Sequence, residues 1–315
     1  MKRMRGRCPI GVTLALLFVI GCSGSPESKE VPPPLLGKIR QWQAQGQRLL
    51  GQGEWELAKS AFEDARQLAE SLDDLPGVVE ALNSLGAIAV QERRADEAVL
   101  LHRRALGLAE ESRQSSLILQ SLTRLGAGLQ VVGQSAEAQE RYQRALSLAR
   151  ESGDKKQEAI VLNNLGLLEL QSGSFDAARG KFEAARALNQ ALGEKREWSA
   201  NLLNLGLVAE AQGQLDEAQR HFESALEMDK ASEQQLAIAG DLAALARVIE
   251  KRGNKPAALA YYQRAYWSYR AVEDLSRARE ALQRAIGLAR ELNRREEAES
   301  LDRELSAMTS TLQRP

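Results

Sequence analysis

Residues 161–188 read VLNNLGLLELQSGSFDAARGKFEAARAL. Apolar residues recur every three or four positions on both sides of Gly173, which is the spacing of two amphipathic helices. Glycine readily adopts the left-handed conformation in which many helices end, so Gly173 is predicted to stop the first helix. We therefore expect one helix over residues 158–171, a short turn, and a second helix over residues 175–192.

The same pattern returns every 40 residues. Three sets of positions keep this period around a central alanine: a glycine twelve residues before it, an aromatic residue or histidine four after it, and an alanine seven after it. The central alanine itself recurs seven times, as Ala58, Ala98, Ala138, Ala178, Ala218, Ala258 and Ala298. A fixed period of this length is typical of a solenoid in which helical hairpins stack.

The composition favours the same class of fold. The chain has 315 residues, of which 43% are hydrophobic and 4% aromatic. This is too apolar for a disordered protein, and the β-branched residues that favour strands are sparse. We predict an all-α, right-handed superhelical solenoid over residues 38–315, made of seven 40-residue repeats of which the last is a degenerate cap.

The first residues predict a targeting segment. Four basic residues within 2–7 precede an apolar run over 9–20, which is shorter than the roughly 20 residues that span a bilayer and is typical of a signal peptide. The run ends in Val-Ile-Gly-Cys at 19–22, which resembles the lipobox of bacterial lipoproteins. The alternative is an ordinary secretory signal in which the cysteine is fortuitous.

The lipoprotein resemblance implies an organisation for this end of the chain. Residues 1–21 would be a cleaved signal peptide, and 22–37 would hold a lipidated Cys22 and a proline-rich tether. The implied modification is an N-acyl group and an S-diacylglycerol on Cys22, and more than one acyl chain gives stable anchoring. Ser23, rather than Asp, follows the cysteine, which in that family favours the periplasmic face of the outer membrane. We expect no other cofactor and no metal.

The charge balance argues against a nucleic-acid partner. The whole chain has 42 Lys and Arg, 43 Asp and Glu, and a net charge of −1. Removing the four basic residues of the leader leaves 38 basic residues against 43 acidic ones, a net charge of about −5. Proteins that bind nucleic acid need a basic footprint, which this chain lacks.

The repeated columns resemble the tetratricopeptide (TPR) family. The motif is apolar-x-x-Leu-Gly followed by Ala-x-x-x-aromatic-x-x-Ala, as at 162–166 and at Ala178, Phe182 and Ala185. The resemblance covers residues 39 to about 310, but the common repeat has 34 residues and a closing proline that is missing here. The six extra residues add about 9 Å of helix to each repeat. Repeats of this length resemble those of kinesin light chains and of Leu-Gly-Asn polarity adaptors.

The TPR resemblance implies a concave groove, lined by the first helix of each repeat, that binds extended or helical peptides. With Val79 as position one of the second repeat, positions two, five, nine and twelve are spaced to share a face, and position six lies beside them. Amide side chains can pair with a peptide main chain in both directions. We predict a peptide-binding groove at Asn83, Thr123, Arg124, Gln130, Asn163, Asn164 and Asn204. The alternative is that these asparagines bridge neighbouring repeats.

The sixth repeat carries an aromatic cluster within residues 261–269. Tyr262, Tyr266 and Tyr269 follow the predicted buried stripe. Tyr261 and Trp267 fit it less well and form a candidate docking patch. The alternative is that both pack the terminal repeats.

Residues suited to catalysis are scarce. His102 stands in the aromatic column and His221 on a predicted helix surface, and no second histidine, cysteine or acid gives metal-ligand spacing. We therefore expect no enzyme and no small-molecule substrate. The predicted function is a lipid-anchored periplasmic adaptor or scaffold that holds a peptide or helix of an envelope protein, with assembly of an envelope complex as one role. The alternative is a structural spacer or a homo-oligomerising module that uses the C-terminal aromatic helix.

Overall fold

The computed structural model describes the backbone of residues 34–312 and the side chains of residues 34–308. Over this range the chain is all-α, with short turns between helices and no strand. The helices are α1 (Pro34–Gly51), α2 (Trp55–Ser71), α3 (Leu75–Gln91), α4 (Ala95–Ser112), α5 (Ser115–Val131), α6 (Ser135–Glu151), α7 (Lys155–Ser172), α8 (Phe175–Leu192), α9 (Lys195–Ala211), α10 (Leu215–Ala231), α11 (Gln235–Lys251), α12 (Lys255–Ala271), α13 (Leu275–Glu291) and α14 (Arg295–Leu312).

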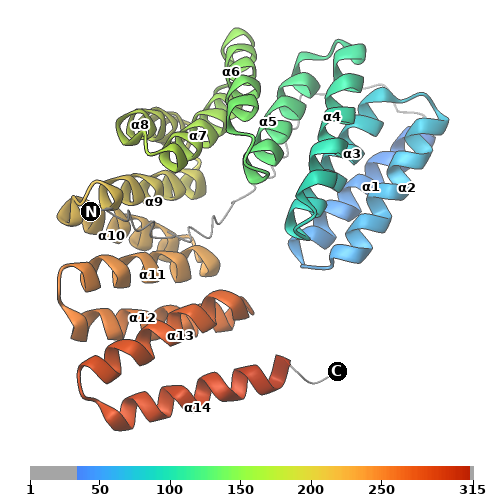
Figure 1. Ribbon diagram of the computed structural model, residues 1–315. Helices are drawn as coiled ribbons and strands as arrows, with labels where there is room; N and C mark the ends of the chain where they lie inside the picture. The colour runs from blue at the N-terminus through green and yellow to red at the C-terminus, as the bar shows by residue number, and fades with distance from the viewer. Residues whose placement is uncertain (1–33, 313–315) are drawn as a thin grey trace, which may run out of the picture. The chain divides into compact units, whose positions relative to one another are not determined.

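These helices form seven hairpins that follow one another in chain order (Figure 1). The second helix of each hairpin packs against its own first helix and against the first helix of the next hairpin. The first helices also contact one another from α1 to α9, so they form an inner row. The structure therefore confirms the predicted all-α solenoid of helix-turn-helix repeats.

The seven alanines that recur every 40 residues, which we call the alanine column, explain how closely the helices approach one another. All seven of its members are buried, six of them fully and Ala298 to within 4% of full burial. A residue without bulk at this position lets two helices cross at short range, as close-packed interiors require. The period of 40 residues is therefore a packing period, in which the same crossing is built seven times.

The recurring glycine of the first helix (the glycine column) leaves space for the recurring aromatic residue or histidine of the second helix (the aromatic column). A Cβ atom added at Gly166 would lie 2.6 Å from Cε1 of Phe182, and one at Gly126 would lie 2.6 Å from Cε1 of Tyr142. Both aromatic side chains are fully buried. The ring thus occupies the space that a side chain at the glycine would need, and each repeat closes around this contact.

Helix α7 begins earlier than the apolar pattern suggested, at Lys155 rather than residue 158. The side chain of Asp154 accepts a hydrogen bond of 3.0 Å from the backbone N–H of Gln157 and caps the helix at this point. The predicted stop is confirmed, because Gly173 has φ +81° and ends the helix in the left-handed region. Helix α8 has the predicted bounds.

The helical array also begins earlier than expected. Helix α1 starts at Pro34, inside the range 22–37 that we interpreted as a tether. Proline suits the first turn of a helix because its missing N–H has no partner there. The predicted signal peptide and Cys22 lie outside the described residues. Within the described range, no helix is long and apolar enough to cross a membrane.

The last hairpin, α13 and α14, differs from the others at two of the recurring positions. Ile286 replaces the glycine of the first helix and is buried. Asp302 replaces the aromatic residue of the second helix and forms an ion pair with Arg290. A polar residue at the position that elsewhere fills a core is what the end of a stack requires, since no further repeat covers it.

Candidate peptide-binding groove

The inner row of first helices brings the predicted groove residues together. Because equivalent positions recur every 40 residues, a side chain on one first helix meets the next first helix at residues 37 to 41 further along. Gln47 donates to Ser84 at 3.3 Å, 37 residues on, and Gln130 donates to Gln171 at 2.8 Å, 41 residues on. The predicted residues therefore lie on adjacent surfaces of α3, α5, α7 and α9.

Asn83 is buried in a bridge between the second and third repeats. Its Nδ2 donates to Oγ of Ser121 on α5 at 3.0 Å, and its Oδ1 lies 3.2 Å from Nδ1 of His102 on α4. Burial lowers the pKa of His102 to about 3, with a further contribution from the charge of Arg124. His102 is therefore neutral at physiological pH and fills the aromatic column, as the sequence predicted.

An amide chain joins the fourth and fifth repeats. Oδ1 of Asn163 accepts from Nδ2 of Asn204 at 2.9 Å and from Nδ2 of Asn201 at 3.0 Å. Asn201 accepts in turn from Nδ2 of Asn189 on α8 at 2.7 Å. Asn201 and Asn189 are both buried, and neither was among the predicted groove residues. The signal for Asn201 was its position 38 residues after Asn163, on the next first helix.

Two further predicted residues are also hydrogen bonded within the protein. Oγ1 of Thr123 donates to the backbone oxygen of Leu119 at 2.8 Å. Oε1 of Gln130 accepts from the hydroxyl of Tyr142 at 3.1 Å, while its Nε2 reaches Gln171. Hydrogen bonds between repeats are thus observed for Asn83, Gln130, Asn163 and Asn204. Binding of a peptide by these residues stays a prediction.

Arg124 and Asn164 differ from the other five. Among the described residues, neither side chain has a hydrogen-bond or ion-pair partner, and both are partly exposed. Arg124 is the only charged residue of α5, and burial lowers the pKa of its guanidinium. Asn164 lies next to Asn163 on α7 and keeps an amide donor and acceptor available. Of the seven predicted groove residues, these two are therefore the ones for which no partner is observed among the described residues.

The inner row becomes charged further along the chain. Glu210 on α9 is buried and accepts two hydrogen bonds of 2.7 Å from Arg247 and one of 2.7 Å from Lys251, both on α11. Burial disfavours its carboxylate, but the hydrogen bonds and charges of Arg247 and Lys251 outweigh this and lower its pKa. Both oxygens of this carboxylate are therefore already hydrogen bonded to side chains of the protein.

A pair of buried acidic residues also lies between the fifth and sixth repeats, where α10 packs against α11. Asp241 on α11 is fully buried and faces Asp229 on α10, which is also buried. Burial and the neighbouring carboxyl of Asp229 raise the pKa of Asp241 to about 9, so that at neutral pH it is protonated and can donate to Asp229. Burial also raises the pKa of Asp229, against the opposing effects of Ser199, Asp241 and Arg196. Sequence analysis gave no sign of this pair.

The candidate docking patch lies on the outer helix α12. Tyr262, Tyr266 and Tyr269 are buried, as predicted. Tyr261 is partly buried and packs against the C-terminal core. Trp267 is 52% exposed. The two residues of the patch therefore have different environments, and Trp267 is the accessible one.

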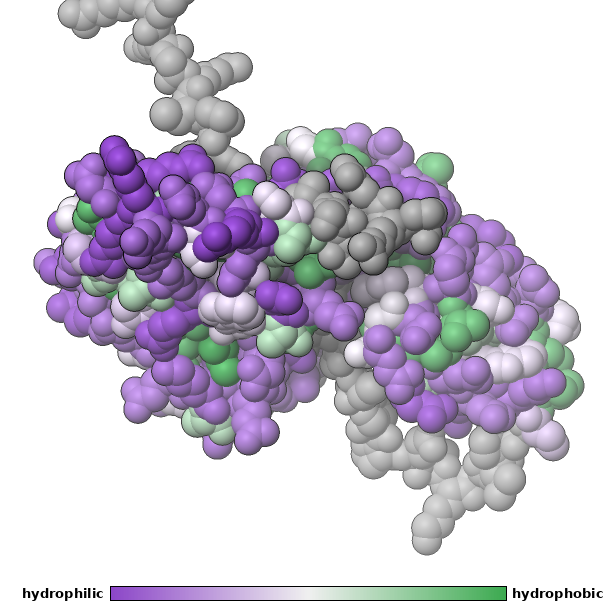
Figure 2. Space-filling model, turned by 90° about the horizontal axis from the view of Figure 1, so that it is seen from below, coloured by the Kyte–Doolittle hydropathy of each residue, from purple (hydrophilic) through white to green (hydrophobic). Residues whose placement is uncertain are grey.

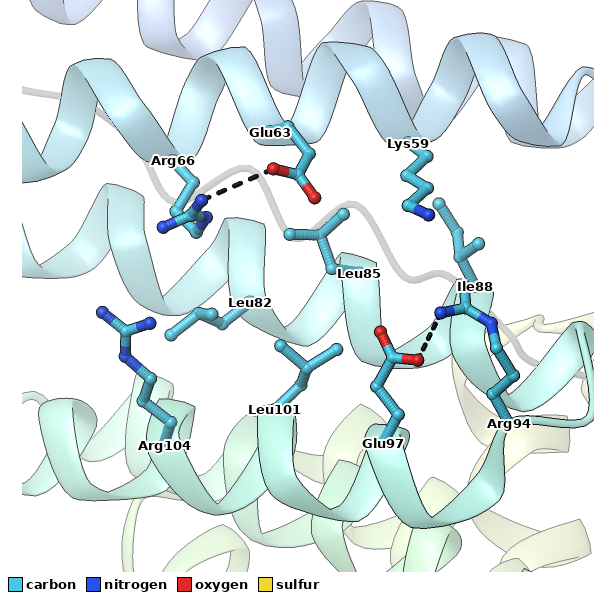
Figure 3. Close-up of a pocket in the computed structure, with 10 residues that line it drawn as sticks. All are labelled: Lys59, Glu63, Arg66, Leu82, Leu85, Ile88, Arg94, Glu97, Leu101 and Arg104. Carbon is cyan, nitrogen blue, oxygen red and sulfur yellow. Dashed lines mark hydrogen bonds and ion pairs between the residues drawn. The ribbon is translucent and has the colours of Figure 1, made fainter.

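A small cleft lies between α2 and α4, with α3 at its floor (Figure 3). Its volume is about 210 Å³, and the buried side chains of Leu82, Leu85 and Ile88 form the floor. The rim charges largely pair with one another, as in the ion pair between Arg66 and Glu63. Pockets that enclose small molecules are usually larger, about 300 Å³ or more. This cleft adds no ligand site to the groove.

Neither the hydrophobic areas on the face drawn in Figure 2 nor any metal-ligating cluster among the described residues adds a second site. Figure 2 shows a face on which hydrophilic residues predominate and hydrophobic residues form small, separate areas. In the part of the chain that the structure describes, no group of three or more His, Cys, Asp or Glu side chains could hold a metal ion. The inner row is thus the feature that the fold builds most consistently.

A stack of helical hairpins with an inner row of polar side chains defines a class of protein, the helical-repeat scaffolds for protein–protein interaction. The chain belongs to the tetratricopeptide repeat family. One sequence model of this repeat matches residues 117–191 and 198–266, and another matches residues 44–113. Together they cover more than half of the chain.

Solved structures share the fold at low sequence identity. A Rap protein complexed with competence and sporulation factor is 16% identical, with a TM-score of 0.66 over 87% of this chain and 76% of that one. The Rap conjugation gene regulator of plasmid pLS20, in complex with the Phr* peptide, is 20% identical, with a TM-score of 0.59 over 88% and 82%. BtubC (BKLC) from P. vanneervenii is 24% identical, with a TM-score of 0.57 over 76% and 93%. No curated protein matches the sequence significantly.

Proposed function

We propose that this protein is a lipid-anchored periplasmic adaptor whose inner row of helices holds a peptide or helix of an envelope protein. It acts by tethering and positioning this partner and performs no chemistry on it. The observation that carries the proposal is the pair Arg124 and Asn164, which are partly exposed on neighbouring first helices and have no partner among the described residues.

These two side chains would bind a peptide in different ways. The amide of Asn164 can donate to a peptide carbonyl and accept from a peptide N–H, so it can hold a main chain irrespective of sequence. The guanidinium of Arg124 offers five donors and a permanent charge, which favours a partner with a carboxylate at that point. The Asn163–Asn204 bridge fixes the two helices beside Asn164, so the site is ordered before a ligand arrives.

Two comparisons support a peptide as the ligand. The similar Rap protein was solved in complex with competence and sporulation factor, and the similar pLS20 regulator in complex with the Phr* peptide. Support for the anchor comes from the leader, in which basic residues, a short apolar run and the Val-Ile-Gly-Cys tetrad at 19–22 stand in the order of a lipoprotein signal. A tether after Cys22 would leave the helical repeats free to meet a partner in the periplasm.

Site-specific cross-linking tests the groove. A photo-reactive residue at Asn164 should capture a protein partner in intact cells, and the same residue at Leu100, exposed on the outer helix α4, should not capture it. The double variant Arg124→Ala/Asn164→Ala should weaken capture of the identified partner about tenfold or more, because both free polar groups are lost. Undiminished binding by this variant, at unchanged helicity and melting temperature, would overturn the proposal.

Fractionation tests the anchor separately. Cys22→Ser should move the protein from the membrane fraction to the soluble fraction and should leave partner binding in solution intact. Membrane association that survives Cys22→Ser would refute lipid anchoring without affecting the groove.

A further inference from the structure

Ion pairs connect successive outer helices in the first half of the protein. Nη2 of Arg104 on α4 lies 2.9 Å from Oε1 of Glu70 on α2, and Nη1 of Arg144 on α6 lies 2.6 Å from Oε1 of Glu110 on α4. In both pairs the arginine stands 34 residues after the glutamate. Between the first and second and between the second and third repeats, the same two positions therefore bring a cation of one repeat to an anion of the previous repeat.

Within the described range, this ion pair is absent between the fifth and sixth repeats. The place of the glutamate is taken by Lys230 at the end of α10, and the place of the arginine by Arg264 on α12. Two cations therefore occupy positions that elsewhere hold an ion pair. Both side chains are exposed, and among the described residues neither has a carboxylate partner.

An exposed tryptophan follows Arg264 on the same face of α12. Arg264, Trp267 and Arg270 are three residues apart, which places them along one side of the helix. The guanidinium of Arg270 lies 5.2 Å from the ring centre of Trp267, and that of Arg264 lies 4.9 Å from the ring centre of Tyr261. Arg270 also donates to the hydroxyl of Tyr266 at 3.1 Å, and the carboxylate of Glu304 on α14 lies beside the same hydroxyl.

The surroundings limit what such a strip can bind. Helix α12 has three basic residues and no acidic one, whereas α10 and α14 each have five acidic and two basic residues. Gln263 of α12 donates to Glu297 of α14 at 2.8 Å, so α14 runs beside the strip. A flat anionic membrane would face the acidic helices as well, whereas a narrow acidic polypeptide can lie along α12 alone.

We propose that the basic aromatic strip, Lys230, Arg264, Trp267 and Arg270, binds an acidic segment of a partner polypeptide. Carboxylates of the segment take the place that Glu70 and Glu110 occupy in the earlier repeats, and an apolar side chain covers Trp267. Tryptophan and arginine are the residues on which binding energy most often concentrates in protein interfaces. The strip lies on outer helices, so this proposal is independent of the groove.

Binding of a model ligand tests the strip. The probe is a fluorescein-labelled peptide of repeated Glu-Glu-Leu-Asp units, and fluorescence anisotropy gives its affinity for the full chain. Arg264→Glu should weaken binding about tenfold or more, and Trp267→Ala several-fold, because each removes one kind of contact. The affinity should also fall with added salt. A control peptide with lysine in place of the acids should not bind.

Matched variants give the control. Arg144→Glu changes a cation that already has a partner, Glu110, and should leave the affinity of the peptide within about twofold. Arg104→Glu on the outer helix α4, where the cation is already paired with Glu70, should likewise have no effect. Loss of binding in Arg124→Ala but not in Arg264→Glu would place the peptide in the groove and overturn the proposal.

Two further outcomes would also overturn it. The first is binding to vesicles of phosphatidylglycerol and phosphatidylcholine that Trp267→Ala abolishes, with no binding of the acidic peptide; this would indicate a membrane contact. The second is a concentration-dependent dimer in light scattering that is lost in Trp267→Ala, again without peptide binding; this would indicate self-association.

Discussion

The inner row has two parts that use polar residues in opposite ways. Along α3, α5 and α7 the predicted groove side chains are neutral apart from Arg124, and Arg124 and Asn164 have no partner among the described residues. Between α9 and α11 the same surface holds Glu210, which Arg247 and Lys251 fully occupy. Both parts have the same helices, spacing and crossings, so the difference lies in the side chains alone.

This difference separates polar residues that are available to bind a ligand from polar residues that link neighbouring repeats. A polar group that another repeat satisfies stabilises the stack, whereas one left unsatisfied costs free energy until a ligand or water pairs with it. The α3–α7 part is therefore the one in which substitutions should alter binding, and the α9–α11 part is the one in which they should alter stability. The following predictions test that division, from the largest expected effect to the smallest.

Arg247→Ala should have the largest effect on stability. It removes two hydrogen bonds from the buried carboxylate of Glu210 and leaves only Lys251, and breaking a buried pair in this way typically costs about 3 kcal/mol. Denaturant unfolding measures the change. Arg144→Ala, which breaks a half-exposed pair with Glu110, should cost less than about 1 kcal/mol. Equal losses in the two variants would contradict the division.

Asp241→Asn should stabilise the protein, and the gain should depend on pH. The folded-state pKa of Asp241 is about 9 and its ordinary value is 3.8, so the folded protein binds more protons than the unfolded one between these values. Stability therefore falls as pH rises through this window. Asparagine cannot titrate and can still donate to Asp229. We expect the gain to vanish below pH 3.8, to be measurable at neutral pH and to grow towards pH 9. Melting curves across this range would show a pH-independent difference if the carboxyl were not buried as described.

Asn201→Ala should destabilise the junction between the two parts. Asn201 is buried and links Asn189 to Asn163, so its loss leaves the amide of Asn189 without a partner. An unsatisfied buried donor costs about 1.5 kcal/mol. Asn164→Ala is the control, because that side chain has no hydrogen bond in the described structure and its loss should leave the melting temperature unchanged. A similar decrease for both variants would indicate that Asn164 also joins repeats.

Arg93→Gly should have the smallest effect, which is a small increase in the free energy of unfolding. Arg93 ends its helical turn with φ +61°, at the place that Gly173 occupies with φ +81° in the fourth repeat. The left-handed region is unfavourable for a side chain with a Cβ, but glycine also has more freedom in the unfolded state. The two effects leave a net gain of about 0.5 kcal/mol. Gly173→Arg should lose a similar amount by thermal unfolding, and a gain there would contradict the reasoning.

The sequence alone predicted the repeats well because each column has a single packing reason. Gly166 must yield space to Phe182, and Ala178 must allow a helix crossing, so both recur wherever that geometry recurs. The predicted groove positions likewise fall on the inner row. The start of α1 at Pro34 was missed because prolines before a helix and within its first turn look alike in sequence.

The residues that recur every 40 positions did not allow us to predict which groove side chains are hydrogen bonded to other parts of the protein. A column compares residues 40 apart, whereas hydrogen bonds across the inner row join residues 37 to 41 apart, depending on how far each side chain reaches. Asn201 belongs to no amide column, although it holds the bridge to Asn163. The acid pair of Asp229 and Asp241 is equally hidden, because only the folded structure shows that both lie in the core.

The connectivity of the hairpins has a consequence for folding. Extensive contacts in the described range join only helices that are one or two apart along the chain, so contacting residues are close in sequence and rapid folding is expected. A stack of this kind can nucleate at any repeat and grow towards both ends. Hydrogen exchange should then be slowest in central helices and fastest at α1 and α14, and the array should fray from its ends before it melts as a whole.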